Sequence, residues 1–362
     1  MPWGSLLFVF YRVTVVDGYC SLKKPVSRTS ETFMSQPSWR QCQLTGEVMS
    51  WFRTAPEGAP PQAALAAAGV ATEGCCATRL VASPVTKPEY HVFSRVFQFI
   101  RDYDRAAAVM KSCGYDGVEW TARPKGFIEP ANAGRDLKKA KRAAERAGLK
   151  AESLVVSFLR GDDPGAEDIA RAAADAGFTS FRGAYFRYDP AKTMQQNLDE
   201  VKRGFESLER LARKTGLKAC YQNHSTYNPK IELFGSVVCD LAQILRDFDP
   251  QYVGVQYDVM HAQAETGPSW MHSIGIVAPW IDILCLKDFW FEPDPKNPKM
   301  WKRHLCMAGE GIVPWGRYRD ILQQYSLRPR YTVHFDYNFP EDEAGAIRCA
   351  SADLKFYRSQ LG

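Results

Sequence analysis

Short apolar runs alternate with longer segments of helical periodicity from Tyr90 to the end of the chain. The runs are rich in β-branched and aromatic residues, as strands are, whereas the longer segments repeat their apolar residues every three or four positions. Several helical segments stop at a glycine, which accepts the left-handed backbone that commonly follows a helix. The pattern predicts strands at 92–99, 117–120, 151–158, 180–186, 217–222, 253–258, 281–288 and 331–337. It predicts helices at 103–112, 134–147, 165–176, 191–215, 235–246, 269–278, 315–325 and 340–360.

This alternation of strands and helices predicts an α/β protein with a closed (β/α)8 barrel, a TIM barrel, over residues 91–362. Runs 253–255 and 281–286 are almost continuously apolar, as expected for parallel strands covered on both faces. A doubly wound open sheet is the alternative, but it needs a glycine-rich phosphate-binding turn after the first strand. Residues 97–101 (FQFIR) contain no such turn. The polar, proline-rich segment 289–307 is expected to be a long loop.

Residues 1–90 lack this periodicity and are expected to form an irregular N-terminal extension, either disordered or a degenerate export signal. The alanine-rich stretch 63–72, followed by Cys75, is similar to the end of a bacterial export signal. A twin arginine and a clear cleavage site are both missing. The location therefore stays open between the cytoplasm and, if the stretch 63–75 is a signal remnant, the periplasm.

The amino-acid composition is typical of some classes of protein and argues against others. Hydrophobic residues make up 45% of the chain and charged residues 24%, as in soluble globular proteins. The net charge of +5 is too small to indicate nucleic-acid binding. Basic segments such as 136–146 are expected to form the solvent-exposed faces of helices. No apolar run reaches the roughly 18 residues that a transmembrane helix needs. The ten cysteines show no zinc-binding spacing.

Polar and titratable side chains gather where the later strands are expected to end. Because the strands of a barrel end at a common rim, the sequence predicts that these side chains line one pocket. They are Gln222, Asn223, His224, Asp258, His261, Lys287, His334 and Asp336.

Short motifs between Val92 and Tyr337 resemble, in their order and spacing, the xylose-isomerase-like TIM barrels of the sugar phosphate isomerase/epimerase family. The resemblance is greatest to a bacterial branch that has a Tyr-Gln-Asn-His motif. The motifs are 116–124 (DGVEWTARP), 221–225 (YQNHS), 256–258 (QYD) with His261-Ala262, 287–289 (KDF), 309–311 (GEG) and 334–337 (HFDY).

The resemblance implies one divalent metal, held by Glu, Asp, His and Glu at the ends of strands five to eight, with the two glutamates moving the proton. The corresponding residues here are Gln222, Asp258, Cys285 and His334, so that only the aspartate matches in kind. Asp258, His261 and Asp336, with His334 nearby, offer a substitute ligand set suited to manganese, zinc, magnesium or iron. Whether a metal is bound stays open at this point.

The resemblance also implies an isomerase or epimerase that acts on a small carbohydrate through an enediolate. His334 or Glu310 is the expected base, and Lys287 is expected to stabilise the oxyanion. Asp258, His261 and Asp336 are the expected metal ligands. The expected substrate-binding residues are Glu119, Trp120, Gln222, Asn223 and His224.

Other interpretations stay open for these residues and for the whole chain. Asp258 could cap a helix, Glu310 could serve a turn, and Trp120 could pack at the barrel rim. The chain could be a lyase or hydrolase of an oxidised sugar, or a barrel that only binds a sugar. A DNA-repair endonuclease of the same fold is disfavoured, because its zinc cluster needs more histidines than the six present. A homo-oligomer is left open.

Overall fold

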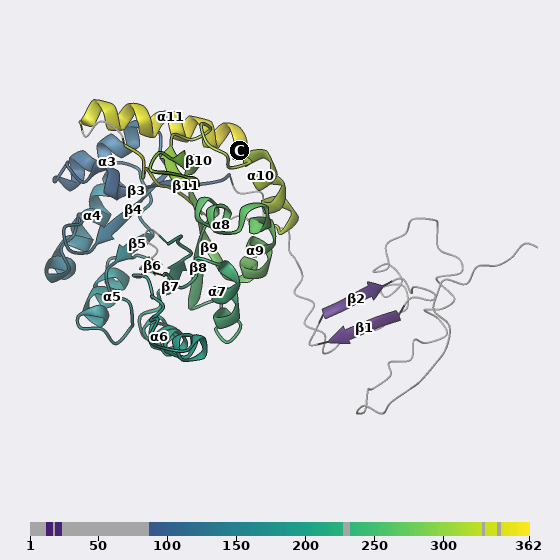
Figure 1. Cartoon of the computed structure of the whole chain (residues 1–362). Helices are drawn as coiled ribbons and strands as arrows, with labels where there is room; N and C mark the ends of the chain where they lie inside the picture. Colours follow the sequence, from purple (N-terminus) through teal and green to yellow (C-terminus); the bar gives the residue numbers. More distant parts are fainter. Residues whose placement is uncertain (1–11, 17–18, 24–86, 227–231, 328–329, 339–341) are drawn as a thin grey trace, which may run out of the picture. The chain divides into compact units, whose positions relative to one another are not determined.

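The computed structural model describes residues 12–16, 19–23, 87–226, 232–327, 330–338 and 342–362 (Figure 1). The chain divides into two compact units, Met1–Pro84 and Val85–Gly362. In the first unit, strands β1 (Arg12–Val16) and β2 (Tyr19–Lys23) form an antiparallel pair. Most of the expected N-terminal extension, including the stretch 63–75, lies outside the described residues.

The second unit contains eight parallel strands that close into a barrel (Figure 1). The closing pair joins the last strand to the first, with Tyr331 opposite Tyr90. This arrangement confirms the barrel predicted from the alternating pattern. The barrel strands are β3 (Tyr90–Phe93), β4 (Gly117–Ala122), β5 (Ser153–Val156), β6 (Ser180–Arg182), β7 (Lys218–Gln222), β8 (Val253–Asp258), β9 (Ile281–Leu286) and β12 (Arg330–Val333).

Helices surround the barrel strands as an outer ring (Figure 1). They are α3 (Tyr103–Ser112), α4 (Ala133–Arg146), α5 (Ala166–Asp175), α6 (Met194–Thr215), α7 (Val238–Leu245), α8 (Val259–Thr266), α9 (Trp270–Val277), α10 (Trp315–Gln324) and α11 (Glu343–Leu361). Local sequence explains where they begin and end. Thr193 and Gln196 form a reciprocal capping box at the start of α6, and Gly216 ends this helix with a φ of 74°.

The first strand is shorter than the sequence analysis predicted. Instead of a strand over 92–99, β3 ends at Phe93 and a 3-10 helix, η1 (Ser94–Phe97), follows it. Phe93, Val96, Phe97 and Ile100 are all buried. Their spacing of three, four and seven residues matches one face of a helical turn, which explains why the chain leaves the sheet here.

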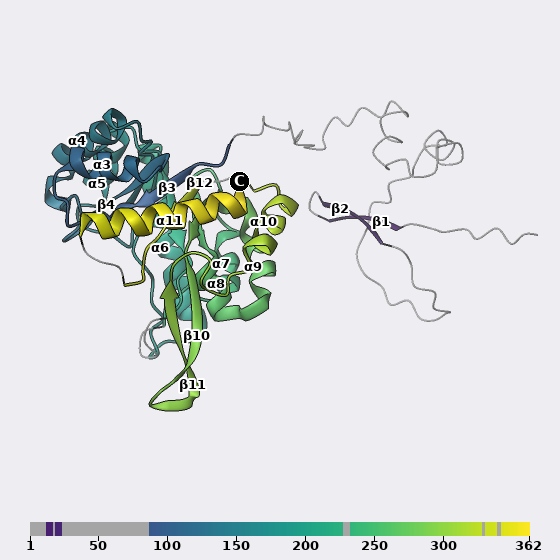
Figure 2. The ribbon, with the colours of Figure 1, turned by 90° about the horizontal axis from the view of Figure 1, so that it is seen from above.

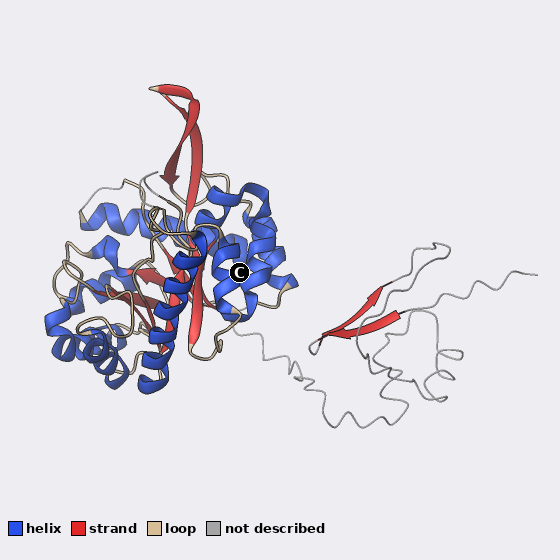
Figure 3. Cartoon of the chain, turned by 60° about the horizontal axis from the view of Figure 1, so that its bottom comes forward, coloured by secondary structure: helices blue, strands red, loops and turns tan. Residues whose placement is uncertain are grey.

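The segment 289–307 is a β-hairpin and not the expected loop. Strands β10 (Asp288–Asp294) and β11 (Asn297–Cys306) pair antiparallel with each other. The hairpin projects well beyond the helices of the barrel (Figures 2 and 3). Helix α8 is a second element that the sequence analysis missed. Asp258 caps it, because its carboxylate accepts a hydrogen bond from the backbone N–H of His261.

Candidate active site

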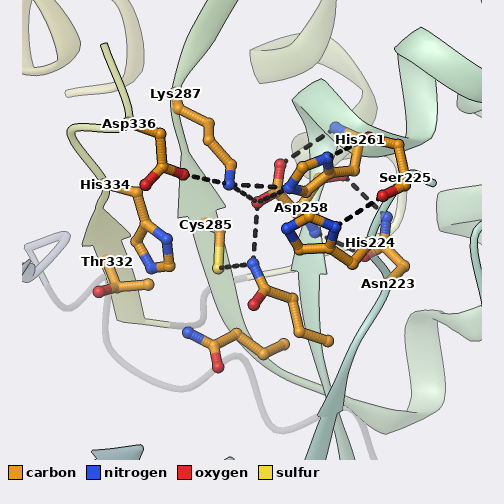
Figure 4. A network of polar contacts seen from close by, with 12 residues as sticks. Asn223, His224, Ser225, Asp258, His261, Cys285, Lys287, Thr332, His334 and Asp336 are labelled. Atoms are coloured by element: carbon orange, nitrogen blue, oxygen red, sulfur yellow. Dashed lines mark hydrogen bonds and ion pairs between the residues drawn. The ribbon is translucent and has the colours of Figure 1, made fainter. Parts of the chain in front are cut away.

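A buried ammonium group lies at the mouth of the barrel. Lys287, directly after β9, is 3% exposed. Its Nζ lies 3.1 Å from Asp258 Oδ2 and 2.9 Å from Asp336 Oδ2. It also lies 2.8 Å from His261 Nε2 (Figure 4). Two carboxylates and an imidazole, from two further strand ends, therefore enclose one positive charge.

The charge on Lys287 is permanent. Burial alone would lower the pKa of its ammonium, but the nearby Asp258 and Asp336 carboxylates outweigh burial and raise the pKa above its ordinary value. Burial would likewise raise the pKa of Asp336, yet Lys287, His334 and Arg95 hold it well below its usual range. The three N–H groups of Lys287 are directed to Asp258, Asp336 and His261, so Lys287 can stabilise an oxyanion by its charge or by exchanging one of these partners for it. It cannot act as a base or form a Schiff base without first losing its proton.

His261 is neutral, and its tautomer follows from its partners. Burial and the neighbouring Lys287 ammonium and His224 ring lower the pKa of His261 well below its ordinary value. An ammonium only donates hydrogen bonds, so His261 Nε2 must accept. Nδ1 therefore holds the proton and donates to Ser225 Oγ at 2.7 Å. Arg303, from the β10–β11 hairpin, also donates to Ser225 Oγ.

The predicted residues of the Tyr-Gln-Asn-His motif surround Asp258. Gln222 Nε2 donates to Asp258 Oδ2 at 2.9 Å, and Asn223 binds the backbone of Asp258 through both ends of its amide. The ring of His224 lies 3.7 Å from that of His261, and burial, followed by the charge of Lys287, lowers the pKa of His224 to about 2. These contacts fix the position of Asp258 and keep a neutral imidazole beside it.

A second polar network fills the barrel interior below this cluster. Glu119, which is fully buried, accepts hydrogen bonds from Gln256 Nε2 at 3.0 Å and from Thr332 Oγ1 at 3.2 Å. His334 Nε2 lies 3.6 Å from Glu119 Oε2, and its ring stacks on Phe93. Burial alone would raise the pKa of Glu119, but His334 and then Arg182 hold it below the ordinary value. Glu119 is therefore an anion next to His334.

A pocket of about 710 Å³ opens at this end of the barrel. Its wall includes Asp336 and His261, two of the three partners of Lys287. Arginines from η1, from the segment after it and from the hairpin line the rest, together with apolar side chains such as Phe335. A volume of this size suits a small-molecule ligand.

Two of the predicted site residues do not join the cluster. Trp120 is completely buried and packs edge-on against Tyr103 and Phe127, between the barrel strands and the helices. Strand alternation turns Trp120 outward when Glu119 points inward, so the structure places Trp120 in the packing position that the sequence left open, and its role in binding a sugar stays a prediction. Glu310 is exposed, and its electrostatic neighbours are Asp353 and Cys306 rather than Lys287 or Asp258.

The sequence analysis also missed residues that complete the site. Gln256 and Thr332 each precede a predicted residue, Asp258 or His334, by two positions. Strand alternation would have placed both on the inward face. Ser225 belongs to the motif 221–225 but was not named as a site residue. Arg303 carried no comparable signal, because it lies in the segment that was expected to be a loop.

The expected metal ligands are brought together around a different cation. Asp258, His261 and Asp336 do converge, but the ammonium of Lys287 lies within 3.1 Å of an atom of each. In this arrangement the ammonium takes the central position, and the role of these three residues as metal ligands stays a prediction.

A second set of donors, which also includes Asp258, is grouped closely enough to hold a metal ion. Asp258, Cys285 and His334 are all buried, and their ligand atoms lie within 4.8 Å of one another. His334 Nε2 has no hydrogen-bond partner among the described residues. A carboxylate, a thiol and an imidazole are a donor set that zinc accepts. They stand at three of the four positions at which the family resemblance implied ligands.

Comparison with known proteins decides the family. The model of the xylose isomerase-like TIM barrel family matches residues 107–346. The chain belongs to this family. The comparison with curated proteins gave no significant match.

Solved structures of similar fold include several sugar epimerases. The 3-keto-D-glucoside 4-epimerase of E. coli is 15% identical, with a TM-score of 0.56 over 75% of this chain and 100% of that one. The D-allulose 3-epimerase of Methylomonas sp. is 16% identical, with a TM-score of 0.56 over 76% and 97%. A xylose isomerase-like TIM barrel protein of Mycobacterium smegmatis, in complex with magnesium, is 13% identical, with a TM-score of 0.53 over 76% and 97%. At these identities the likeness concerns the fold.

Proposed function

We propose that this protein is a sugar isomerase or epimerase whose reaction passes through an enediolate at the mouth of the barrel. One observation carries the proposal. Asp258 and Asp336 hold the buried Lys287 ammonium, and at the end of the neighbouring strand His334 Nε2 lies 3.6 Å from Glu119 and has no hydrogen-bond partner among the described residues. The epimerases of similar fold support the choice of substrate class.

Lys287 acts on the substrate oxygens. A sugar with neighbouring carbonyl and hydroxyl groups enters the pocket, and the carbonyl oxygen faces the ammonium. Because Lys287 keeps its proton, it stabilises the negative charge that develops on this oxygen when the adjacent carbon loses its proton. Asp258 and Asp336 hold the ammonium in place, and their own charges are balanced by it and by Arg95.

His334 is the base in this proposal. Its Nε2 takes the proton from the carbon next to the carbonyl, and the electron pair of that C–H bond becomes part of the enediolate. Glu119, an anion 3.6 Å from Nε2, stabilises the imidazolium that forms. Return of the proton to the neighbouring carbon gives an isomer, and return to the opposite face of the same carbon gives an epimer. Glu310 is assigned no part in this step, because it is exposed and its charge acts on Asp353.

A divalent ion, if one is bound, would be held by Asp258, Cys285 and His334. It would supply further polarisation of a substrate oxygen. In that state His334 would be a ligand rather than the base. Elemental analysis of the purified protein, compared with the Cys285→Ser variant, tests this ligand set directly.

Exchange of carbon-bound hydrogen in heavy water tests the reaction. Wild-type protein is expected to place deuterium on the carbon next to the carbonyl of a ketose, as seen by NMR. His334→Gln is expected to lower the exchange rate by about 10²- to 10⁴-fold, the usual contribution of a general base. His272→Gln is the matched control, because His272 is an exposed residue of α9. Binding of ketoses without exchange in the wild type would instead identify a sugar-binding barrel.

A further inference from the structure

The wall of the active-site pocket is rich in arginine. Arg95 lies in η1, Arg101 follows η1, and Arg303 lies in β11 of the projecting hairpin. All three line the pocket of about 710 Å³, and Asp336 is the one carboxylate in its described lining. Two separate parts of the chain therefore bring guanidinium groups to the same opening.

The positive charge at the opening exceeds what the site's own carboxylates balance. Asp336 is already paired twice, with Lys287 at 2.9 Å and with Arg95 at 3.2 Å. Asp258 is paired with Lys287 at 3.1 Å. Arg303 binds the neutral hydroxyl of Ser225, and Arg101 donates a long hydrogen bond of 3.4 Å to the carbonyl of Gly126. Neither of these two arginines forms an ion pair with a described carboxylate, although the half-buried carboxyl of Glu265 is an electrostatic neighbour of Arg303.

A further arginine adds to the same excess. The guanidinium of Arg123 lies over the ring of Phe93, 5.7 Å from its centre, next to the stacked His334. Burial, together with the charges of Arg182 and Arg95, lowers the pKa of Arg123. Such crowding of like charges costs free energy in the empty protein, and a bound anion would relieve it.

We propose that the substrate carries an anionic group, a carboxylate or a phosphate monoester, which Arg95, Arg101 and Arg303 bind at the pocket opening. This inference rests on the proposed function: the anionic end faces the arginines while the carbonyl end reaches Lys287 and His334. Guanidinium groups suit the task, because their planar fork of donors matches carboxylate and phosphate oxygens and keeps its charge at every physiological pH. The proposal thus separates this protein from an enzyme of uncharged ketoses.

Arg101 is the residue to change. Arg95 touches Asp336 and Arg303 touches Ser225, so that their removal would also disturb the cluster around Lys287. Among the described residues, Arg101 makes only the long hydrogen bond to Gly126, and it is exposed. The matched control is Arg171→Gln, which removes one exposed arginine of α5 that pairs with Glu167.

The experiment measures exchange in heavy water with three ketoses of one carbon skeleton: D-fructose, D-fructose 6-phosphate and D-fructuronate. We expect exchange with one of the two anions at a KM far below that for D-fructose. Arg101→Gln should raise KM for that anion by about 10- to 100-fold with kcat within about twofold, as for loss of a charge-assisted hydrogen bond. The KM for D-fructose should change far less than the KM for that anion, and Arg171→Gln should resemble the wild type. Which anion reacts decides between carboxylate and phosphate.

Different results would refute the anionic substrate and the proposed isomerase function. Equal KM values for D-fructose and both anions, unchanged in Arg101→Gln, would overturn the anionic substrate and leave the isomerase intact. No exchange with any ketose would count against the proposed function. In that case, thermal stabilisation by inorganic phosphate or gluconate that Arg101→Gln abolishes would still support anion recognition. The absence of such stabilisation would refute it.

Discussion

At the scale of single residues, the site consists of charges that depend on one another. Lys287 is buried because Asp258 and Asp336 are present, and the charge of Lys287 in turn helps to hold the pKa of Asp336 below its usual range. Such a group of buried charges contributes little net stability, but removing one member leaves the others without a partner. Activity and folding are therefore coupled at this position.

We expect Lys287→Met to abolish exchange and to destabilise the fold by about 3–5 kcal/mol, because Asp258 and Asp336 lose their counter-ion. The double variant Lys287→Met/Asp336→Asn should regain part of the stability and none of the activity. Urea unfolding and the exchange assay measure the two effects. Wild-type stability in the single variant would contradict the contacts of Lys287 described here.

A second buried group gives the protein a pH-dependent stability. Asp353, in α11, is 2% exposed and accepts hydrogen bonds from the backbone N–H of Ala308 and from Tyr337. Burial raises its pKa to about 7, and the charges of Glu310 and Asp288 add to the rise. Between about pH 4 and pH 7 the folded protein keeps a proton that the unfolded chain has lost. The contribution of Asp353 to stability therefore falls as the pH rises through this range and is constant above it.

Asp353→Asn should remove this dependence. We expect the variant to be about as stable as the wild type near pH 4 and more stable, by about 2–4 kcal/mol, at pH 8. The difference between the two unfolding free energies across pH 4–8 isolates Asp353 from all other titrating groups. A difference that does not change with pH would show that the group does not titrate in this range.

Much of the residue cluster was predictable, since Gln222, Asp258, Lys287 and His334 all stand at predicted strand ends. The contacts that each of these residues makes were not predictable. A strand end tells which rim a side chain occupies, but the pairing of Lys287 with Asp258 depends on the closure of eight strands. The geometry of two side chains on neighbouring strands decides whether an ammonium or a metal lies between their oxygens.

At the scale of elements, the connection after β9 is held by one carboxylate. Asp288, 1% exposed, accepts hydrogen bonds from the backbone N–H groups of Gly309 and Val313 and from the indole of Trp315. These three hydrogen bonds connect the base of the β10–β11 hairpin to the start of α10, and we call them the Asp288 bracket. The hairpin carries Arg303, so this bracket also positions one wall of the pocket.

Gly311→Ala should break the bracket. An added Cβ would overlap Asp288 Oδ1 and the carbonyl oxygen of Phe289, so the loop must move. We expect a loss of about 1–3 kcal/mol, as for other overpacking changes, and weaker anion binding. Gly316→Ala is the control, because nothing lies within 4 Å of its added Cβ and it belongs to α10. That change should stabilise the protein by about 0.5–1 kcal/mol. Equal melting temperatures for the two variants would contradict the bracket.

Elements with regular periodicity were predicted well, and irregular ones were not. The limits of β8 match the expected 253–258 because its apolar run ends at a charged residue. The hairpin was missed because prolines and charges, which favour loops, occupy strands that are exposed and pair only with each other. Helix α8 was missed because the polar residues around His261 were interpreted as a rim loop.

At the scale of the whole molecule, the barrel closes on itself near both of its chain ends. Tyr331 donates its backbone N–H to Glu89, and the rings of Tyr90 and Tyr331 stack. The hydroxyl of Tyr90 donates to the carbonyl of Gly362 at 2.9 Å. These contacts all lie within Val85–Gly362, and no described helix is long and apolar enough to cross a membrane.

We therefore predict that a fragment of residues 85–362 folds and works without the preceding residues. Its melting temperature should lie within about 3 °C of that of the full chain, a difference below about 1 kcal/mol. Its exchange activity should be unchanged. A start at residue 92, which removes Glu89 and half of β3, is the comparison and should fail to fold. Loss of activity in the longer fragment would assign a role to the first unit.

Lys287 has one further consequence. The positive charge among Asp258, Asp336 and His261 is a side chain of the polypeptide itself, so every folded molecule contains it. A chelator cannot extract it, and a shortage of ions in the surroundings cannot deplete it.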